Sequence, residues 1–317
     1  MQYLEAQDYG FNIIIKEYAK FPKFFPLPCH FEHGWTVLDD PLITDLAVDK
    51  PLMLVFNNRR AGKWKNKSDI PVKIMGSPFC HFRKIHNIVS SKTARGTVAF
   101  PSHSTKNLVS KFNIDEYCKH LNDLPEKFKP ITVCLLWLDY LDQSAKIYQK
   151  SGFSVVTCGP KVSNSLEFVK NYYQILSNHK YVTSNDIGSY TFYAIEMGLP
   201  FFLVGETPEM IMKKGRSDPN VSKKYKMTDF DRGRRITALF STGPVTMISP
   251  AQKNLVSEEI GQNECLSSRE LNKLLWIYSR KNHFLVSALI PYLVYALLSK
   301  LGLGPSIIKL KNKLFKS

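Results

Sequence analysis

The sequence predicts an α/β protein built on a doubly wound parallel sheet, and three observations predict it. From Thr97 onward, short apolar runs alternate with amphipathic stretches. The run from Ile131 to Leu138 is almost continuously apolar, which suits a strand buried on both faces of a parallel sheet. Between Ser165 and Asn178 the apolar residues are spaced three or four apart, as in a helix that buries one face. Strands that alternate with helices favour a parallel sheet with helices on both faces.

Composition sets the limits of this prediction. The chain has 317 residues, of which 44% are hydrophobic, enough for two α/β domains or for one domain with extensions. Basic residues outnumber acidic ones by 43 to 27, a formal net charge of +16. This charge indicates an anionic partner, which could be nucleic acid, anionic lipid or a phosphorylated substrate. The six cysteines form no Cys-x-x-Cys pair and the first residues lack the order of a signal peptide, so we expect a reducing compartment.

The first part of the chain predicts short strands separated by turns. Strands are expected at 11–15, 52–56 and 72–75. The Pro- and Phe-rich segment 21–28 is expected to be irregular, and the basic run Arg59 to Lys67, with Trp64 inside it, is expected to be a solvated loop.

The rest of the chain predicts the alternating pattern in full. Further strands are expected at 97–100, 131–138, 154–158, 181–183 and 200–204. Helices are expected at 115–124, 143–150, 165–178, 190–197, 229–240, 250–260 and 268–279. The polar segment Glu206 to Lys226 is expected to be a long loop, in which Arg216 is a candidate phosphate ligand.

The C-terminal segment has a different character. Residues 284–298 are almost wholly apolar but fall short of the roughly 20 residues that a spanning helix needs. A tail follows in which apolar residues are interleaved with Lys309, Lys311, Lys313 and Lys316. This pattern favours an interfacial anchor on anionic lipid. The alternative is a C-terminal helix that packs back across the rest of the protein.

The strongest functional signal is the segment from Tyr181 to Pro200. A short strand ends in small and polar residues, after which Gly188 and Ser189 open a helix that carries Glu196. A helix N-terminus offers free amides and a positive dipole end to a phosphate, and small residues allow a close approach. The alternative is an ordinary crossover in which Asn185 or Ser189 caps the helix and Glu196 is solvated.

This segment resembles the donor-binding strand, loop and helix of glycosyltransferases with the GT-B fold. The resemblance covers roughly 97–260 and implies two Rossmann-like domains, with an N-terminal domain that is reduced in length here. It implies that Asn185, Gly188, Ser189 and Tyr190 lie near the diphosphate or sugar of a donor, and that Glu196 lies near the ribose. UDP-sugar 2-epimerases and glycerol-phosphate polymerases carry similar turns. The domains expected are 1–92 on the acceptor side, 93–265 for the nucleotide sugar, and 266–317 as C-terminal helices.

A second signal follows the strand expected at 97–100. Pro101 closes this strand and is followed by Ser102, His103, Ser104 and Thr105, which could hydrogen-bond a phosphate. Ligands of open α/β sheets bind at the carboxyl ends of strands near a topological switch point, so we expect this loop to face the Asn185 loop. The loop resembles the first loop of the C-terminal half in surface-polysaccharide transferases. The alternative is a turn that only caps the next helix.

A third signal is the segment His30 to Trp35. It resembles the His-Gly turn that lines the acceptor side in several GT-B relatives, which implies that His33 or Glu32 is the general base for the acceptor hydroxyl. The alternative is a loop histidine that is hydrogen-bonded to backbone.

The sequence contains no Asp-x-Asp motif and no metal-ligand spacing, so we expect neither a metal nor another cofactor. Helix N-termini and basic side chains would then neutralise the donor phosphates.

Together, these signals favour a metal-independent, GT-B-like glycosyltransferase. It would act in the cytoplasm at the inner face of the plasma membrane, on a lipid-linked or growing surface polysaccharide such as lipopolysaccharide or capsule. We expect a nucleotide-sugar donor and an anionic membrane surface as partners, and not nucleic acid. A nucleotide-sugar epimerase of the same fold, or a non-catalytic protein that binds membrane or nucleic acid, stays open as an alternative. The hypothesis requires the Ser102–Thr105 and Asn185–Ser189 turns to converge on a shared anion pocket between the two lobes.

Overall fold

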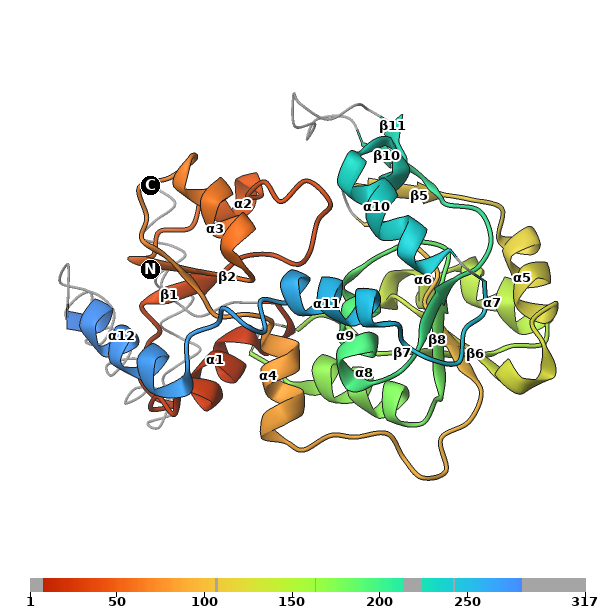
Figure 1. The fold of residues 1–317 in the computed structure, drawn as a ribbon, viewed down its shortest axis with the longest axis horizontal. Helices are drawn as coiled ribbons and strands as arrows, with labels where there is room; N and C mark the ends of the chain where they lie inside the picture. Colours follow the sequence, from red (N-terminus) through yellow and green to blue (C-terminus); the bar gives the residue numbers. More distant parts are fainter. Residues whose placement is uncertain (1–7, 106–107, 163, 214–223, 242, 281–317) are drawn as a thin grey trace, which may run out of the picture.

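The computed structural model describes residues 8–105, 108–162, 164–213, 224–241 and 243–280. Within them the chain is a mixed α/β protein with two parallel sheets and one small antiparallel sheet. The three-stranded parallel sheet lies at one end of the molecule and the five-stranded parallel sheet at the other (Figure 1). This arrangement agrees with the predicted Rossmann-like α/β class.

The three-stranded sheet has the order β1-β2-β3, with all strands parallel. Its strands are β1 (Cys29–Phe31), β2 (Leu52–Val55) and β3 (Val72–Ile74), and its helices are α2 (Ile43–Leu46) and α3 (Asn58–Lys65). The predicted basic loop at 59–67 was wrong, because Asn57 caps a helix there by accepting a hydrogen bond from the Arg60 amide at 3.1 Å. Trp64 and Arg60 of this helix are fully buried.

The predicted strand at 11–15 was also wrong. This segment begins helix α1 (Phe11–Ala19), which follows the short 3-10 helix η1 (Asp8–Gly10). The buried positions Phe11, Ile14, Ile15 and Ala19 recur every three or four residues, so their spacing is helical. Helix α1 packs beside α4 (Pro78–Ile85). No helix was predicted from the sequence at 78–85.

The five-stranded sheet has the order β7-β6-β4-β8-β9, and all its neighbouring pairs are parallel. Its strands are β4 (Thr97–Ala99), β6 (Ile131–Leu135), β7 (Ser154–Thr157), β8 (Tyr181–Ser184) and β9 (Phe201–Leu203). The chain proceeds outward from β4 through β6 to β7, then returns to the other side of β4 with β8. The topological switch point therefore lies between β4 and β8.

Helices cover both faces of this sheet. Helices α5 (Ile114–Asn122) and α7 (Gln143–Lys150) share one apolar cluster with the sheet. The short elements η2 (Glu126–Phe128) and α6 (Trp137–Leu141) add Phe128 and Tyr140 to it. Helices α8 (Glu167–Ser177) and α9 (Ser189–Met197) contribute to a second cluster. That second cluster continues into α1 and α4, where the Phe79 and Tyr193 rings stack at 4.9 Å. One apolar core thus joins the helices of the two parallel sheets.

The antiparallel sheet has the order β11-β10-β5 and follows the loops at the carboxyl ends of β4 and β9. Its strands are β5 (Leu108–Lys111), β10 (Glu209–Met212) and β11 (Lys224–Tyr225). The long loop predicted at 206–226 was wrong in its described parts, because β10 and β11 pair there. Arg216 lies outside the described residues.

The last described elements are η3 (Met227–Asp229), α10 (Asp231–Phe240), α11 (Pro250–Glu259) and α12 (Ser268–Arg280). Helix α11 lies between the two parallel sheets, and α12 returns to the side of the three-stranded sheet (Figure 1). There the Asn272 amide donates to the carbonyl of Ala19 at 2.9 Å. The predicted apolar segment 284–298 and the basic tail lie outside the described residues. No helix within the described ranges has the length and apolarity to cross a bilayer.

Buried ions tie α10 and α11 to the three-stranded sheet. Glu259, whose side chain is 2% exposed, pairs with Arg59 at 2.7 Å and with Arg232. Asp39 pairs with Arg232 at 2.7 Å and with Arg59. Trp35 adds a hydrogen bond to Glu259 at 2.8 Å. Arg232 therefore joins α10 both to Asp39 and to Glu259 of α11.

Candidate functional site

The two loops that were predicted to converge lie side by side at the switch point. Strands β4 and β8 pair directly, and the Phe100 amide extends the ladder to the carbonyl of Thr183 at 2.9 Å. Beyond the strands, the Ser102 amide donates to Asn185 Oδ1 at 2.8 Å, and Ser184 Oγ donates to the carbonyl of Phe100 at 2.6 Å. The two turns are therefore adjacent, as the sequence hypothesis requires, and the shared anion pocket stays a prediction.

The hydroxyl groups of the Ser102–Thr105 loop are partly engaged by strand β5. Ser110 donates through its hydroxyl to Ser102 Oγ at 2.8 Å and through its amide to Ser104 Oγ at 3.1 Å. The Leu108 amide donates to Thr105 Oγ1 at 3.1 Å. These oxygens thus shape the loop, and their contribution to a ligand is limited to their remaining hydrogen-bonding capacity.

Asp186 is a residue of this site that the sequence analysis missed. It directly follows Asn185, is 7% exposed, and accepts the Ile187 amide at 2.8 Å. Burial raises the pKa of Asp186 to about 7, against the lowering influence of hydrogen bonds from Ile187 and Ser102. A carboxylic acid at a strand end beside Asn185 was the available signal. A carboxyl group that titrates near neutrality at a switch point can hold or release a proton.

The Asn185–Ser189 turn leads into α9, whose N-cap residue is Gly188. The Gly188 amide donates to Thr191 Oγ1 at 3.3 Å, so one of the amides at this helix start is already engaged. The remaining first amides of such a helix are available to an anion. Asn185 is 2% exposed, and its Nδ2 has no hydrogen-bond partner among the described residues. The turn therefore combines the remaining N-terminal amides of α9 with an Asn185 side-chain donor that has no partner among the described residues.

Tyr190 has a supporting position in this turn. Its hydroxyl donates to the carbonyl of Asp186 at 3.0 Å and lies 2.9 Å from Ser184 Oγ. Its ring also explains the glycine at 188, because a Cβ there would lie 2.5 Å from Tyr190 Cε1. A residue without a side chain is therefore needed at 188 because the Tyr190 ring fills the space beside it. The resemblance had implied instead that Gly188 lies close to a ligand.

Glu196 does not lie at the switch point. It is seven residues beyond Ser189 on α9, which is about 10 Å along the helix axis. Its side chain is 3% exposed, and its two carboxylate oxygens accept from Arg83 of α4 at 2.7 and 2.8 Å. This bidentate ion pair joins α4 to α9 and occupies the carboxylate that was expected near a ribose, so that role is corrected to a structural one.

Glu32 is likewise unsuited to the predicted role of general base. It is fully buried, its Oε1 lies 2.7 Å from Arg60 Nε, and it accepts from the Phe56 amide and Trp64 Nε1 at 2.9 Å. Burial raises the pKa of Glu32, while the charge of Arg60 and these hydrogen bonds oppose the rise. Its carboxylate holds β1 to α3 and cannot reach an acceptor.

His33 occupies a more suitable place. Its side chain is exposed, and its backbone amide donates to Asp45 Oδ2 at 2.7 Å. The adjacent Gly34 lies against α9, since a Cβ there would be 3.8 Å from Ser189 Oγ. Partial desolvation lowers the pKa of His33, with Asp45 opposing it. His103 is half-buried, and desolvation lowers its pKa to about 4. Both imidazoles are thus neutral at pH 7.

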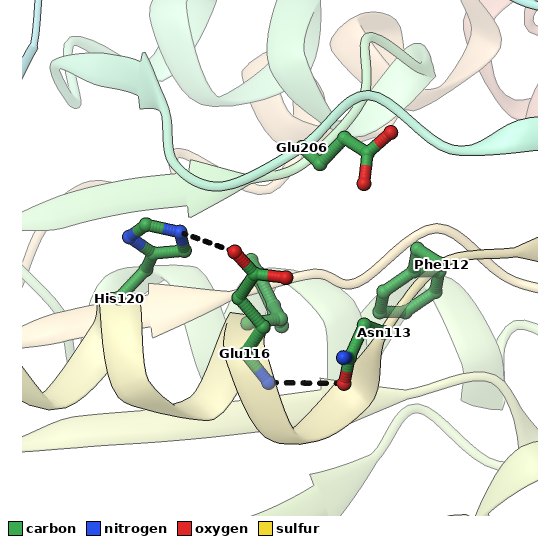
Figure 2. A pocket seen from close by; sticks show the side chains of 6 residues that line it. Phe112, Asn113, Glu116, His120 and Glu206 are labelled. Carbon is green, nitrogen blue, oxygen red and sulfur yellow. Dashed lines mark hydrogen bonds and ion pairs between the residues drawn. The ribbon is translucent and has the colours of Figure 1, made fainter.

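A shallow pocket lies elsewhere, between the N-terminal turn of α5 and the loop after β9 (Figure 2). Figure 2 shows Glu116 and His120 of α5 below Glu206, with Asn113 capping the helix. His120 Nε2 lies 3.9 Å from Glu116, and Lys226 pairs with Glu206 at 3.0 Å. The two carboxylates would repel a phosphate, so this pocket does not suit the anionic ligand expected here. The described residues contain no cluster of His, Cys, Asp and Glu that could hold a metal ion.

Comparisons with known proteins leave the family open. No protein-family model matches the chain, and no curated protein matches it. Among solved structures, the chain is similar to a structure described as the Glycosylation Associate Protein (Gap123) complex from Streptococcus agalactiae, with 14% identity and a TM-score of 0.29. The match covers 79% of this chain and 44% of that chain, so the present chain spans less than half of it. A similarity this low carries no weight for fold or function.

Proposed function

We propose that the chain is a metal-independent, GT-B-like glycosyltransferase. It moves a sugar from a nucleotide-activated donor to a lipid-linked or growing surface polysaccharide. The observation that supports this proposal is the hydrogen bond between the Ser102 amide and Asn185 at the switch point, which brings the two predicted donor loops together.

Each group at this edge has a role in the proposed transfer. The remaining N-terminal amides of α9 and the side-chain amide of Asn185 hydrogen-bond the donor phosphates and stabilise the negative charge on the leaving nucleotide. His33, from the three-stranded sheet, accepts the proton of the acceptor hydroxyl, since its lowered pKa keeps it unprotonated at pH 7. Asp186 is a second group that can hold a proton there.

The domain arrangement follows the same proposal. Residues 1–92 supply the acceptor side, 93–265 bind the donor, and 266–317 form the C-terminal part with a basic amphipathic tail at the inner face of the plasma membrane. The net charge of +16 supports contact with an anionic surface.

The test is a donor screen with the whole chain. UDP-, GDP-, CMP- and dTDP-sugars are titrated while thermal unfolding is followed, and a ligand that raises the melting temperature is then supplied with a lipid-linked acceptor. Transfer of radiolabelled sugar supports the proposal. Asn185→Ala should abolish the thermal shift, whereas Asn122→Ala, which changes an exposed asparagine on α5, should retain it.

Two other outcomes contradict the proposal. No shift with any donor, with a cooperative unfolding transition, would argue for a non-catalytic protein. Conversion of the nucleotide sugar to an epimer without an acceptor would favour the epimerase alternative.

A further inference from the structure

An exposed phenylalanine lies on the turn that follows α1. Helix α1 ends where Lys20 adopts a left-handed conformation with a φ of 51°. The buried Lys16 holds the turn in place, because its Nζ donates to the carbonyl of Lys23 at 2.9 Å. Phe24, the next residue, is 60% exposed. The turn therefore holds a large apolar side chain in solvent at a defined position.

Helix α12 brings a second exposed apolar side chain to the same place. The centroid of the Phe25 ring lies 5.7 Å from that of Phe24 and 5.1 Å from that of Trp276 on α12. Ile277, which follows Trp276, is 49% exposed. Two segments from opposite ends of the described chain thus expose apolar side chains on either side of one aromatic contact.

Exposed basic side chains accompany both apolar residues. On the turn, one lysine directly precedes Phe24 and another lies four positions before it. On α12, basic residues lie four positions before and three positions after Ile277, so they are its neighbours on the helix surface. Among the described residues, none of these four cations lies in an ion pair. We call this region the Phe24–Ile277 surface, and it consists of Phe24, Ile277, Lys20, Lys23, Lys273 and Arg280.

Acidic side chains are scarce in the segments that form this surface. Residues 20–28 contain no Asp or Glu. Helix α12 contains Glu270, whose carboxylate accepts from the amide and the hydroxyl of Ser267 at 2.8 and 2.6 Å. Glu17 of α1 pairs with His86 at 3.3 Å. The Phe24–Ile277 surface is therefore positively charged, and a complementary partner is anionic.

The geometry of the rings favours a lipid surface over a nucleic acid. Bases stack on open aromatic faces. Here the rings of Phe24 and Phe25 meet at 60°, those of Phe25 and Trp276 meet at 62°, and Ile277 has no ring. The core of a protein–protein interface is depleted of charge, whereas each apolar side chain here has cations beside it. Apolar side chains flanked by Lys and Arg suit the boundary between anionic headgroups and acyl chains.

We propose that the Phe24–Ile277 surface docks the folded part of the chain on an anionic membrane. Phe24 and Ile277 enter the headgroup region, and the four cations contact lipid phosphates. The proposed function assigns membrane contact to the basic tail. This inference deepens that contact by adding a preformed surface from the turn after α1 and from α12, and it does not depend on glycosyl transfer.

The sequence that follows α12 agrees with this placement. Helix α12 ends at Arg280, a member of the surface. Residues 281–317 lie outside the described ranges, and within them 284–298 contain no charged residue. Apolar and basic sequence therefore continues from a residue of the proposed docking surface.

The experiment measures partition of the whole chain onto sedimented vesicles of phosphatidylcholine, alone or equimolar with phosphatidylglycerol. Wild type should bind the anionic vesicles more tightly. Phe24→Ser/Ile277→Ser should lower the partition coefficient roughly 10- to 100-fold, because two apolar side chains no longer leave water. The control is Leu141→Ser/Met247→Ser, at positions 62% and 80% exposed, which should change it less than about twofold.

The charges are tested separately. Lys20→Gln/Lys23→Gln should lower the partition coefficient on anionic vesicles roughly 10-fold and weaken its dependence on salt, since two cations near the headgroups are lost. Lys150→Gln/Lys170→Gln removes two exposed cations from α7 and α8 and should change it less than about twofold. All substituted side chains are exposed, so each variant should keep the melting temperature of wild type.

Tryptophan fluorescence locates the contact. Lipids brominated along the acyl chains should quench part of the emission of the vesicle-bound protein, and Trp276→Phe should remove that quenched part. Trp137→Phe, on α6, should retain it. Quenching that is unchanged in Trp276→Phe would overturn the proposed orientation.

Three further results would overturn the docking surface. The first is wild-type protein that binds neither kind of vesicle. The second is equal binding by wild type, Phe24→Ser/Ile277→Ser and Lys20→Gln/Lys23→Gln, which would assign the contact to residues 281–317. The third is binding of a single-stranded oligonucleotide, lost in the same variants, by a protein that does not bind vesicles.

The outcomes separate this inference from the proposed function. Vesicle binding that depends on the Phe24–Ile277 surface, in a protein that binds no nucleotide sugar, retains the surface and rejects the transferase. Transfer of sugar by a protein that does not bind vesicles retains the transferase and rejects the surface.

Discussion

Two strand ends in this molecule carry acidic side chains next to residues of a candidate site, and they differ in how well those side chains are satisfied. At the end of β1, Glu32 is fully buried and has an ion pair and two further hydrogen bonds. At the end of β8, Asp186 is buried and has its pKa raised to about 7, and the neighbouring Asn185 Nδ2 has no hydrogen-bond partner among the described residues. A saturated carboxylate supports the fold, whereas an incompletely satisfied polar cluster is available for a ligand.

The largest loss of stability should come from a substitution that removes a partner of Glu32 at the end of β1. Arg60→Ala leaves Glu32 buried without its counter-ion, so the free energy of unfolding should fall by about 3–5 kcal/mol. Urea unfolding followed by circular dichroism measures the change. The control is Lys63→Ala on the same helix, since Lys63 forms an exposed ion pair with Asp40 at 3.7 Å and should change stability by less than about 1 kcal/mol. Equal losses of stability in Arg60→Ala and Lys63→Ala would contradict the structural role given to the buried Glu32 carboxylate.

A smaller effect is expected at the unsaturated end. Asn185→Ala removes the acceptor of the buried Ser102 amide, and an unsatisfied buried donor lowers stability by about 1–3 kcal/mol. The same urea titration applies, and Asn122→Ala, at an exposed position, should change stability by less than about 0.5 kcal/mol. A loss as large as that of Arg60→Ala would mean that Asn185, too, is chiefly structural.

The carboxyl group of Asp186 should make stability depend on pH. Its pKa is raised in the folded state from 3.8 to about 7, so the folded state favours the protonated acid. This contribution is present in full below pH 4 and is lost as the pH rises through about 7. Asp186→Asn removes the titration, so the variant should gain stability relative to wild type between pH 5 and pH 8. If the difference in urea midpoint between Asp186→Asn and wild type is the same at pH 5 and at pH 8, the assignment of this titration to Asp186 is wrong.

The smallest effect on stability should come from His33. Its side chain is exposed, so His33→Ala should change the free energy of unfolding by no more than about 0.5 kcal/mol. The comparison variant is His81→Ala, since His81 is 8% exposed, contacts the carbonyl of Met75 at 2.6 Å and stacks on Tyr18 at 3.8 Å. Thermal unfolding should give a lower melting temperature for His81→Ala only. A comparable drop for His33→Ala would place His33 in the fold rather than at the site.

The sequence by itself determined the alternating half of the molecule. Strands β4, β6, β7, β8 and β9 and helices α5, α7, α8 and α9 were predicted from local patterns, because each of them has an apolar run or face of its own. The strand predicted at 131–138 was too long, since β6 ends at Leu135 and α6 begins at Trp137, and β5 was not predicted. The neighbourhood of Ser102 and Asn185 could also be predicted, since parallel strands present their carboxyl ends at one edge.

Only the tertiary structure decided the rest. The segment at Phe11 was predicted as a strand but forms helix α1, which packs against α4 and α12. The basic run at Arg59 was predicted as a loop but forms a helix in which Arg60 and Trp64 are buried against Glu32. Whether the charges of Glu196 and Lys161 are paired depends on distant residues. Arg83 forms an ion pair with Glu196, whereas Lys161 lies over the Tyr9 ring and has no carboxylate within ion-pair distance among the described residues. Charge on a side chain is a local property, but whether that charge is satisfied depends on which remote segments fold against it.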